Sequence, residues 1–302
     1  MLLRTNGAAT KSTRKPSRSK RLVSKSRAFH VKFLLFVISA LTLKWFFKIL
    51  QVDTLRSCPL AISEYNRNAR SRFKIFIGAG TRNYLVAAKH LLYSLEERSS
   101  VLVNHSKGVH ILTSERALGE CIQTFRGTQA NCVRSTPYFQ QTGSHPDVYN
   151  KFDTVAHSDA EDWVVYLDAD MVVLEELFSV VDTVPISYLI MGVKNFPLTK
   201  RILFGQESWG VNGGFLIYNK RIIVEQQDAI QQMMRQGIND QIIWSRLFHQ
   251  YRTRHGSCLL DETYNCRLNV HRLCYKRAKV AHYSSTAKRG LYYFEMSDRN
   301  GN

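Results

Sequence analysis

The sequence predicts an α/β fold with a mostly parallel central sheet flanked by helices, and three observations support this. Short apolar, β-branched runs alternate with longer segments of helical periodicity. One such run, residues 164–167, is followed by two aspartates, at positions 168 and 170. This is typical of a buried strand that reaches a ligand site at its carboxyl end. Residues 72–302 are also numerous enough for one domain with a sizeable core.

Each predicted strand is a short apolar run bounded by polar or glycine-containing segments. The first run ends at Gly78, where we expect a loop, and the last begins as a loop before it becomes a strand. The predicted strands cover residues 73–78, 109–113, 162–167, 188–193 and 211–219.

Helical segments lie between these runs. In residues 84–98, Leu85, Ala88, Leu92 and Leu95 recur at spacings that place them on one helix face. Further helices are predicted over residues 115–126, 174–180, 221–237 and 239–249. Strands that alternate with helices in this way favour parallel neighbours in one sheet.

The N-terminus predicts a membrane anchor. Residues 1–32 form a basic tail with ten lysines or arginines and no acidic residue. Residues 33–50 form an apolar span of about 18 residues, near the lower limit for crossing a bilayer. A positive flank before the span predicts a cytosolic N-terminus, so we expect a single-pass type II membrane protein whose remaining chain is lumenal or extracellular. Residues 51–71 then form a stem, and residues 72–302 a lumenal domain.

A basic organellar targeting peptide is the alternative for this region, because such peptides also lack acidic residues. The N-terminal region dominates the net charge of +18, and the remainder of the chain is only about +6. That balance is compatible with a phosphorylated substrate. No nucleic-acid recognition motif accompanies it, so we expect no nucleic-acid partner.

The six cysteines form no Cys-x-x-Cys pair, which argues against a zinc ribbon. In a lumenal chain, this even number favours one to three disulfides, with Cys121–Cys132 and a bridge within residues 258–274 as candidates. Buried free thiols are the alternative. A glycosylation sequon, Asn104-His105-Ser106, lies in a polar stretch and predicts an exposed loop.

Asp168 and Asp170 are the strongest candidates for a metal site. Residues i and i+2 of a strand point to the same side, so the two carboxylates can converge at the strand end. Oxygen ligands suit Mg²⁺ or Mn²⁺, ions that commonly hold substrate phosphates. A solvated turn is the alternative, but the apolar runs on both sides argue against it.

Together with further motifs, these aspartates make the chain resemble glycosyltransferase family 8, the glycogenin-like and galactinol-synthase-like retaining transferases that use UDP-sugars. The resemblance covers most of residues 72–290 and consists of motifs in a fixed order. In chain order these motifs are Asn83-Tyr84, Ser94-Leu95, residues 149–152, residues 166–170, residues 176–178, residues 211–215, residues 239–241, Leu247-Phe248, residues 260–265, and His282-Tyr283 with Lys288.

The resemblance implies a GT-A type nucleotide-diphospho-sugar transferase fold and transfer of a hexose or pentose with retention at the anomeric carbon. It implies that Mn²⁺, or alternatively Mg²⁺, is held by Asp168, Asp170 and His282, where mixed oxygen and nitrogen donors favour Mn²⁺. It implies that Lys288 neutralises the diphosphate of the UDP-sugar donor. The acceptor, a glycan, protein or lipid, is not named by the sequence, nor is the oligomeric state.

The resemblance also implies roles for other residues, each with a structural alternative. Lys151 would assist Lys288 at the diphosphate, or it is a surface lysine. Asn212 and Gly213 would face the sugar, or they form a simple turn. The remaining candidates are Asp240 and Gln241 near the anomeric carbon or as a helix N-cap, Asn83 and Tyr84 beside the uracil, and Asn265 orienting the sugar site or capping a turn.

The chain departs from the family pattern at three places. Arg289-Gly290 stands where the family has Pro-Trp, Ser285 replaces a glycine, and Lys194-Asn195 stands where an aspartate is common. Arg289-Gly290 and the nearby cysteines resemble the xyloside xylosyltransferase branch. These departures motivate a second hypothesis, an inactive family member that binds UDP-sugar or glycan as a partner subunit. A nucleotidyl- or phosphotransferase is disfavoured, because the sequence contains no Gly-x-x-x-x-Gly-Lys loop.

Overall fold

The computed structural model describes residues 30, 32–44, 57–58, 73–135, 150–157, 163–183, 187–195, 210–252, 256–267 and 272–283. The chain divides into two units, Met1–Thr54 and Leu55–Asn302. In the first unit, residues 32–44 are helical, and residues 45–50 of the predicted span lie outside the described residues. Within the part of the chain that the structure describes, none of the helices combines the length and the apolar character needed to cross a bilayer.

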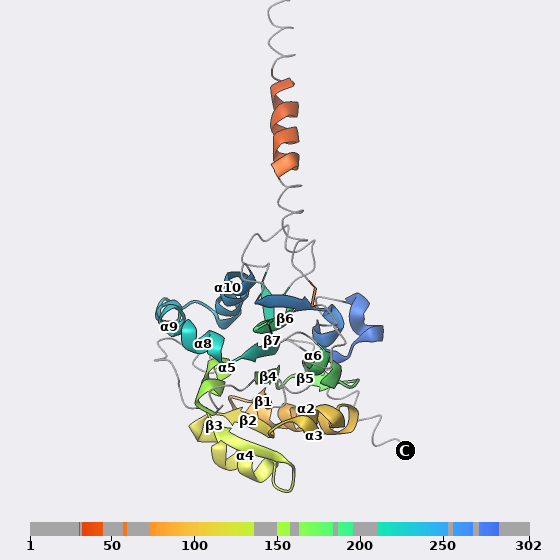
Figure 1. Cartoon of the computed structure of the whole chain (residues 1–302), viewed down its shortest axis with the longest axis vertical. Coiled ribbons are helices and arrows are strands. Elements are labelled where there is room, and N and C mark those ends of the chain that lie inside the picture. The colour runs from red at the N-terminus through yellow and green to blue at the C-terminus, as the bar shows by residue number, and fades with distance from the viewer. Residues whose placement is uncertain are drawn as a thin grey trace, which may run out of the picture. The chain divides into compact units, whose positions relative to one another are not determined.

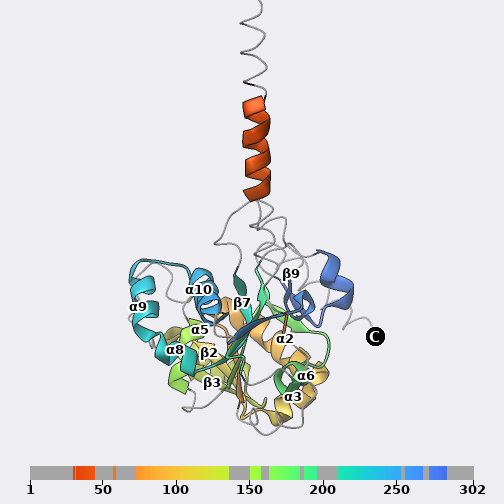
Figure 2. The ribbon, with the colours of Figure 1, turned by 45° about the horizontal axis from the view of Figure 1, so that its top comes forward.

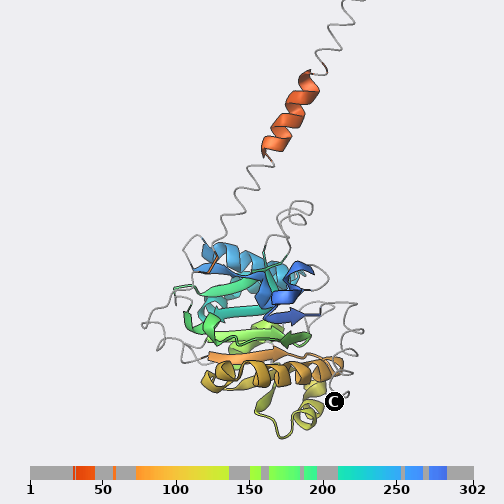
Figure 3. The same cartoon turned by 90° about the vertical axis from the view of Figure 1, so that its right-hand side faces the viewer.

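The second unit is built on a seven-stranded sheet whose strands succeed one another across the unit (Figure 3). Six strands are parallel, and β7 runs antiparallel to its neighbours β4 and β6, so the prediction of a mostly parallel sheet is confirmed. In spatial order the strands are β3 (Ala130–Arg134), β2 (Val109–Thr113), β1 (Phe73–Gly78), β4 (Trp163–Asp168), β7 (Val211–Asn219), β6 (Ile190–Lys194) and β8 (Ser257–Leu260).

Helices cover both faces of this sheet, as Figures 1 and 2 show. One face carries α2 (Arg82–Arg98), α3 (Ser100–His105), α4 (Leu118–Thr124) and α6 (Phe178–Thr183). The other carries α5 (Asn150–Asp153), α8 (Arg221–Glu225), α9 (Gln227–Arg235) and α10 (Asp240–Arg252). Short 3₁₀ segments complete the unit: η2 (Glu115–Ala117), η4 (Thr154–His157), η6 (Glu262–Asn265) and η7 (Arg272–Arg277).

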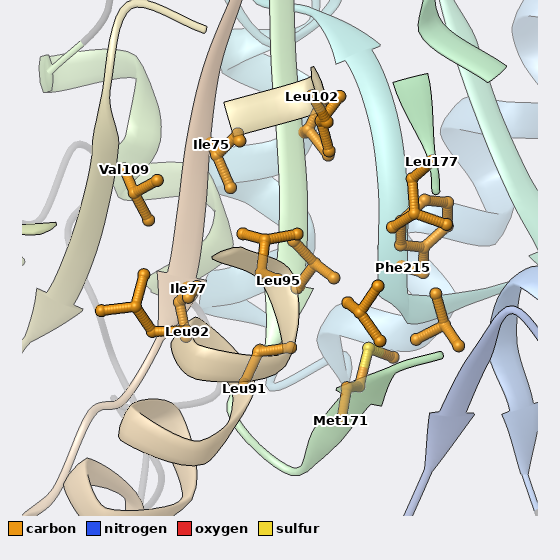
Figure 4. Close-up of a cluster of buried hydrophobic side chains, with 14 of the residues drawn as sticks. Ile75, Ile77, Leu91, Leu92, Leu95, Leu102, Val109, Met171, Leu177 and Phe215 are labelled. Carbon is orange, nitrogen blue, oxygen red and sulfur yellow. The ribbon is translucent and has the colours of Figure 1, made fainter. Parts of the chain in front are cut away.

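The core lies between the sheet and α2. Leu91, Leu92 and Leu95 of α2 are fully buried and face Ile75 and Ile77 of β1 (Figure 4). On the opposite face, the buried Trp244 ring of α10 stacks on Phe152 with ring centroids 4.8 Å apart. This double coverage explains why β4 reads as a continuous apolar run, because a strand buried on both faces has no polar side.

A second, three-stranded sheet lies beside the end of β4. Its strands are β5 (Met171–Val173), β10 (Val280–His282) and β9 (Cys266–Arg267), with β10 in the centre. These strands were not predicted, because runs of two or three residues give no period of their own. They matter because β10 pairs with β5 immediately after the two aspartates.

Several element boundaries differ from the predictions. The helix predicted over 221–237 is two helices separated at Gln226, and the helix expected at 174–180 begins only at Phe178. Segment 211–219 is a strand over its whole length rather than a loop leading into one. The sequon asparagine Asn104 is exposed as expected, but it lies in α3 instead of a loop.

Three disulfides join the six cysteines, so the alternative of buried free thiols is wrong. Cys121–Cys132 is the predicted bridge, and Cys266–Cys274 lies within the predicted group. The third, Cys58–Cys258, spans 200 positions of the chain. It fixes residues 57–58 along β8, where Ser57 also forms a parallel bridge with Leu259. Part of the segment predicted as a stem is therefore attached to the sheet.

Candidate metal centre at the carboxyl edge of the sheet

The two predicted aspartates lie where the main sheet meets the second sheet. Asp168 is the last residue of β4, and Asp170 closes the turn that leads into β5. β10 runs antiparallel to β5 with His282 opposite Met171, and the N–H of Tyr283 donates to the backbone oxygen of Asp170 at 2.9 Å. Strand pairing therefore brings His282 beside Asp170 although more than a hundred residues separate them.

One ligand atom each from Asp168, Asp170 and His282 lies within 4.8 Å of the other two. Two ligands of one Mg²⁺-sized ion can be at most about 4 Å apart, so small side-chain movements suffice to bring all three onto one cation. Asp170 and His282 are buried, and Nε2 of His282 lies 3.3 Å from Oδ1 of Asp170. The structure thus contains the Asp-Asp-His cluster that the resemblance implies.

Lys151 lies in the same cluster. Its Nζ is 2.9 Å from Oδ2 of Asp240 and 3.4 Å from Oδ1 of Asp168, and the residue is 9% exposed. Burial disfavours the ammonium, but the attraction of Asp168 and then Asp240 outweighs it and holds the pKa of Lys151 above its ordinary value. The alternative of a snorkelling surface lysine is therefore wrong.

The cluster carries an excess of negative charge. Among the described residues it sets the ammonium of Lys151 against three carboxylates, those of Asp168, Asp170 and Asp240. Burial raises the pKa of Asp168, Lys151 lowers it, and Asp170 raises it again, with a net upward shift. Carboxylates removed from water without matching charge are costly, and a divalent cation would remove that cost. The donor set and the charge both fit a bound Mn²⁺ or Mg²⁺.

Asn212 and Gly213 open strand β7 beside this cluster. A Cβ at Gly213 would lie 2.8 Å from Nζ of Lys151, so glycine is needed for this approach. Asn212 is 7% exposed, and the strand pairs with β4 and β6, so the alternative of a simple exposed turn is wrong. Gly213 therefore lies against Lys151, and Asn212 is connected to His282 through Asn265.

Asp240 and Gln241 begin helix α10 and project toward the same place. The expected N-cap role of Asp240 is not observed, because Asn239 accepts the hydrogen bond from the N–H of Gln241 at 2.8 Å. The side chain of Gln241 instead bonds to β7: its Oε1 accepts from the N–H of Gly213 at 2.9 Å, and its Nε2 donates to the backbone oxygen of Val211. Gln241 thereby fixes the start of β7.

The remaining candidates lie at the rim or outside the described residues. Asn83 and Tyr84 are exposed in the first turn of α2, which follows the carboxyl end of β1. They border the same edge of the sheet, and their contact with uracil stays a prediction. Lys288 lies outside the described residues, so its role also stays a prediction.

Sequence reasoning assigned Asn265 to the sugar site or a turn, and missed its partner. Its Oδ1 lies 2.8 Å from Nδ1 of His282, and its Nδ2 donates to Oδ1 of Asn212 at 2.8 Å. Neutral amides have no spacing signature, and these contacts join positions that are 17 and 53 residues apart. The ordered motifs placed all three residues near the site but gave no signal for these contacts.

A cavity of about 610 Å³ opens at the carboxyl ends of β6 and β8. The charged residues that line it are Lys194, Asp261, Glu262, Arg277 and Lys279. The predicted site residues that the structure describes do not line this cavity. Lys194, which stands where the resembling family commonly has an aspartate, does line it.

No family model and no curated protein matches this sequence. Among solved structures, the chain is similar to the apo form of the glycosyltransferase GlyE of Streptococcus pneumoniae TIGR4, with a TM-score of 0.50 and 15% identity. That match covers 71% of this chain and 55% of GlyE, so the chain spans about half the length of that protein.

The chain is also similar to apo mouse xyloside xylosyltransferase 1, with a TM-score of 0.50 and 14% identity over 72% of this chain and 99% of that one. At this level of identity the likeness concerns the fold. The chain therefore has the α/β fold, with a mostly parallel central sheet, of GT-A glycosyltransferases.

Proposed function

We propose that this protein is a retaining glycosyltransferase of the family 8 type that transfers a hexose or pentose from a UDP-sugar to a lumenal acceptor. The observation that carries the proposal is the convergence of Asp168, Asp170 and His282 within 4.8 Å at the carboxyl edge of a glycosyltransferase-like fold. Ligands of open α/β sheets bind at this edge. The motif order read from the sequence supports the specific family and donor.

In this proposal the three ligands hold Mn²⁺, with Mg²⁺ as a substitute. A bound cation would supply positive charge to the diphosphate that leaves the sugar. Asp168 and Asp170 lie at and just after the end of β4 and His282 lies on β10, so a bound cation would lie where the two sheets meet. Lys288 is proposed to meet the same diphosphate.

The contacts of Lys151 support a second role beside the one proposed for it at the diphosphate. Its ammonium is shared between Asp168 and Asp240, so it links the metal-binding strand to helix α10. This ion pair holds the carboxylate of Asp240 beside Gly213, whose missing side chain makes room for the ammonium of Lys151. We propose that Lys151 orients Asp240, and that Asp240 and Gln241 lie next to the anomeric carbon.

The N-terminal segment is proposed to anchor the enzyme in the Golgi or ER membrane with residues 72–302 in the lumen. The basic tail and the apolar span 33–50 support this proposal. The three disulfides are consistent with an oxidising compartment.

The test is release of UDP by the full chain against a panel of UDP-sugars, with Mn²⁺ and with EDTA. We expect one donor to be turned over in a metal-dependent way, and Asp170→Asn to abolish turnover. Mn²⁺-dependent UDP binding without turnover of any donor, with acceptors supplied, would instead favour the inactive binding partner. Release of pyrophosphate or phosphate rather than UDP would contradict the proposal.

A further inference from the structure

A chain of neutral side chains connects the backbone of β7 to the metal cluster. It begins at Gln241, whose Oε1 accepts from the N–H of Gly213 at 2.9 Å and from Nδ2 of Asn212 at 3.3 Å. It continues through Asn212, whose Oδ1 accepts from the N–H of Gly214 at 2.9 Å. Two successive backbone amides of β7 therefore contact this chain of side chains.

The chain ends at His282. Oδ1 of Asn212 also accepts from Nδ2 of Asn265 at 2.8 Å, and Oδ1 of Asn265 lies 2.8 Å from Nδ1 of His282. Asn212, Asn265 and His282 are 7%, 1% and 4% exposed. Because water hardly reaches them, these polar atoms depend on one another for their hydrogen bonds.

The two backbone amides determine the direction of every hydrogen bond in the chain. A backbone N–H can only donate, so an oxygen must face Gly213 and another must face Gly214. The amide groups of Gln241 and Asn212 are therefore oriented by the main chain. Since Asn212 presents an oxygen to Asn265, Asn265 must present its NH₂ group there and its own oxygen to His282.

An amide oxygen facing Nδ1 requires a hydrogen on that nitrogen. In the neutral ring, Nε2 then carries the free lone pair, and it points at Oδ1 of Asp170, 3.3 Å away. Two acceptors facing each other at this distance repel unless a positive charge, carried by a proton or a metal cation, lies between them. This chain of neutral side chains therefore orients His282 so that the lone pair of Nε2 is available to a metal ion.

We infer that Asn265 and Asn212 are positioning residues that fix the Nδ1–H tautomer of His282 and so present its Nε2 lone pair to the divalent cation. This inference rests on the proposed function. Metal-ligating histidines generally donate their second ring N–H to an acceptor that sets tautomer and ring orientation. Here that acceptor is a side-chain amide, itself oriented by the backbone of the strand that carries Gly213.

Two substitutions at Asn265 separate its role as acceptor from its role in packing. Asn265→Leu keeps a similar volume but removes the acceptor for Nδ1 of His282. Asn265→Asp keeps that acceptor and removes the donor to Asn212. If the inference holds, the leucine variant loses the tautomer and the aspartate variant keeps it. A merely structural role would make both variants alike.

The tautomer is measured on the metal-free full chain, with ¹⁵N-labelled histidine and the ring uncharged, by long-range ¹⁵N–¹H correlation spectra. The wild type and Asn265→Asp should carry hydrogen on Nδ1, and Asn265→Leu should shift hydrogen to Nε2, next to Asp170. Calorimetric titration with Mn²⁺ should show affinity about 10- to 100-fold weaker in Asn265→Leu. Asn265→Asp should bind Mn²⁺ more tightly than Asn265→Leu does.

Hydrogen on Nε2 in the wild type would overturn the inference even if no variant folds. Equal tautomers and equal Mn²⁺ affinity in the wild type and Asn265→Leu would overturn it as well. If the wild type does not bind Mn²⁺ at all, the proposed function fails, while the wild-type spectrum still decides the tautomer.

Discussion

Two carboxylates on either side of strand β5, Asp168 and Glu176, have opposite environments. Glu176 is partly buried and satisfied by donors at the starts of two helices, which are Oγ of Ser99 and the N–H groups of Val101, Leu102, Leu177 and Phe178. Burial would raise the pKa of Glu176, but these hydrogen bonds hold it below the ordinary value. Asp168 has its pKa raised by burial, because the charge of Lys151 compensates it only in part.

The difference separates a carboxylate with a structural role from one that we propose to bind a metal ion. Glu176 caps α3 and α6 and needs no further partner. Asp168 shares its surroundings with Asp170 and Asp240, and a bound cation would complete its environment. A carboxylate with a raised pKa inside a cluster of like charges is typical of a ligand-binding site. A carboxylate whose hydrogen bonds come from backbone donors is typical of a helix cap.

The largest effect is expected from Lys151→Met, which breaks the buried ion pairs to Asp168 and Asp240. Loss of one partner of a buried pair should lower the free energy of unfolding by about 3 to 5 kcal/mol. Urea denaturation measures this change, with the exposed Lys276→Met as a control. A loss no larger than that of the control would show that Lys151 does not compensate the cluster.

The second-largest effect is expected for the dependence of folding stability on the metal ion. Mn²⁺ at 100 times its dissociation constant should stabilise the wild type by about 2.7 kcal/mol, because it binds only the folded state. Asp170→Asn removes a ligand and should abolish this gain, while the exposed Asp228→Asn should retain it. Thermal unfolding with Mn²⁺ and with EDTA checks this. An undiminished gain in Asp170→Asn would place the cation elsewhere.

Gly214→Ala tests the close packing around His282. A Cβ here would lie 2.6 Å from Cε1 of His282 and 2.7 Å from Cε of Met171, so those side chains must move. Overpacking of this kind should cost about 1 to 3 kcal/mol and weaken Mn²⁺ binding. The control is Gly119→Ala in α4, where a Cβ meets nothing within 4 Å. Equal Mn²⁺ affinities in the two variants would contradict the prediction.

The smallest effect concerns the structural carboxylate. Glu176→Gln should lower stability at neutral pH by about 1 kcal/mol and leave Mn²⁺ affinity unchanged. Because the pKa of Glu176 is lower in the folded state, its stabilisation is complete above the ordinary value of 4.5 and is lost as pH falls through the folded value. The difference between wild type and variant should therefore shrink in acid. Denaturation at several pH values tests this, with the exposed Glu175→Gln as a control.

The sheet and the two aspartates could be predicted from the sequence because their signals are local. β4 is a continuous apolar run, and the two carboxylates come directly after it in the sequence. The strand geometry expected for an i, i+2 pair is not observed, because β4 ends at Asp168 and Asp170 lies in the turn that follows. The role of His282 as a metal ligand could be predicted only from the ordered motifs of a family resemblance. A single histidine on a three-residue strand carries no sequence pattern of its own.

The supporting contacts could not be predicted, because they join distant positions through common residue types. The role of Lys151 depends on Asp240 of α10 reaching back to the end of β4. Likewise, Cys58 pairs with Cys258 across 200 positions, and nothing in cysteine spacing selects that partner.

Whether Asp168, Asp170 and His282 bind the cation is decided by anomalous X-ray diffraction from crystals of the protein grown with Mn²⁺ and UDP. We predict a manganese peak within bonding distance of Asp168, Asp170 and Nε2 of His282, and no such peak in Asp170→Asn crystals. A manganese ion bound elsewhere would contradict this prediction. UDP bound with no metal at these three residues, and with the same affinity with and without Mn²⁺, would also contradict it.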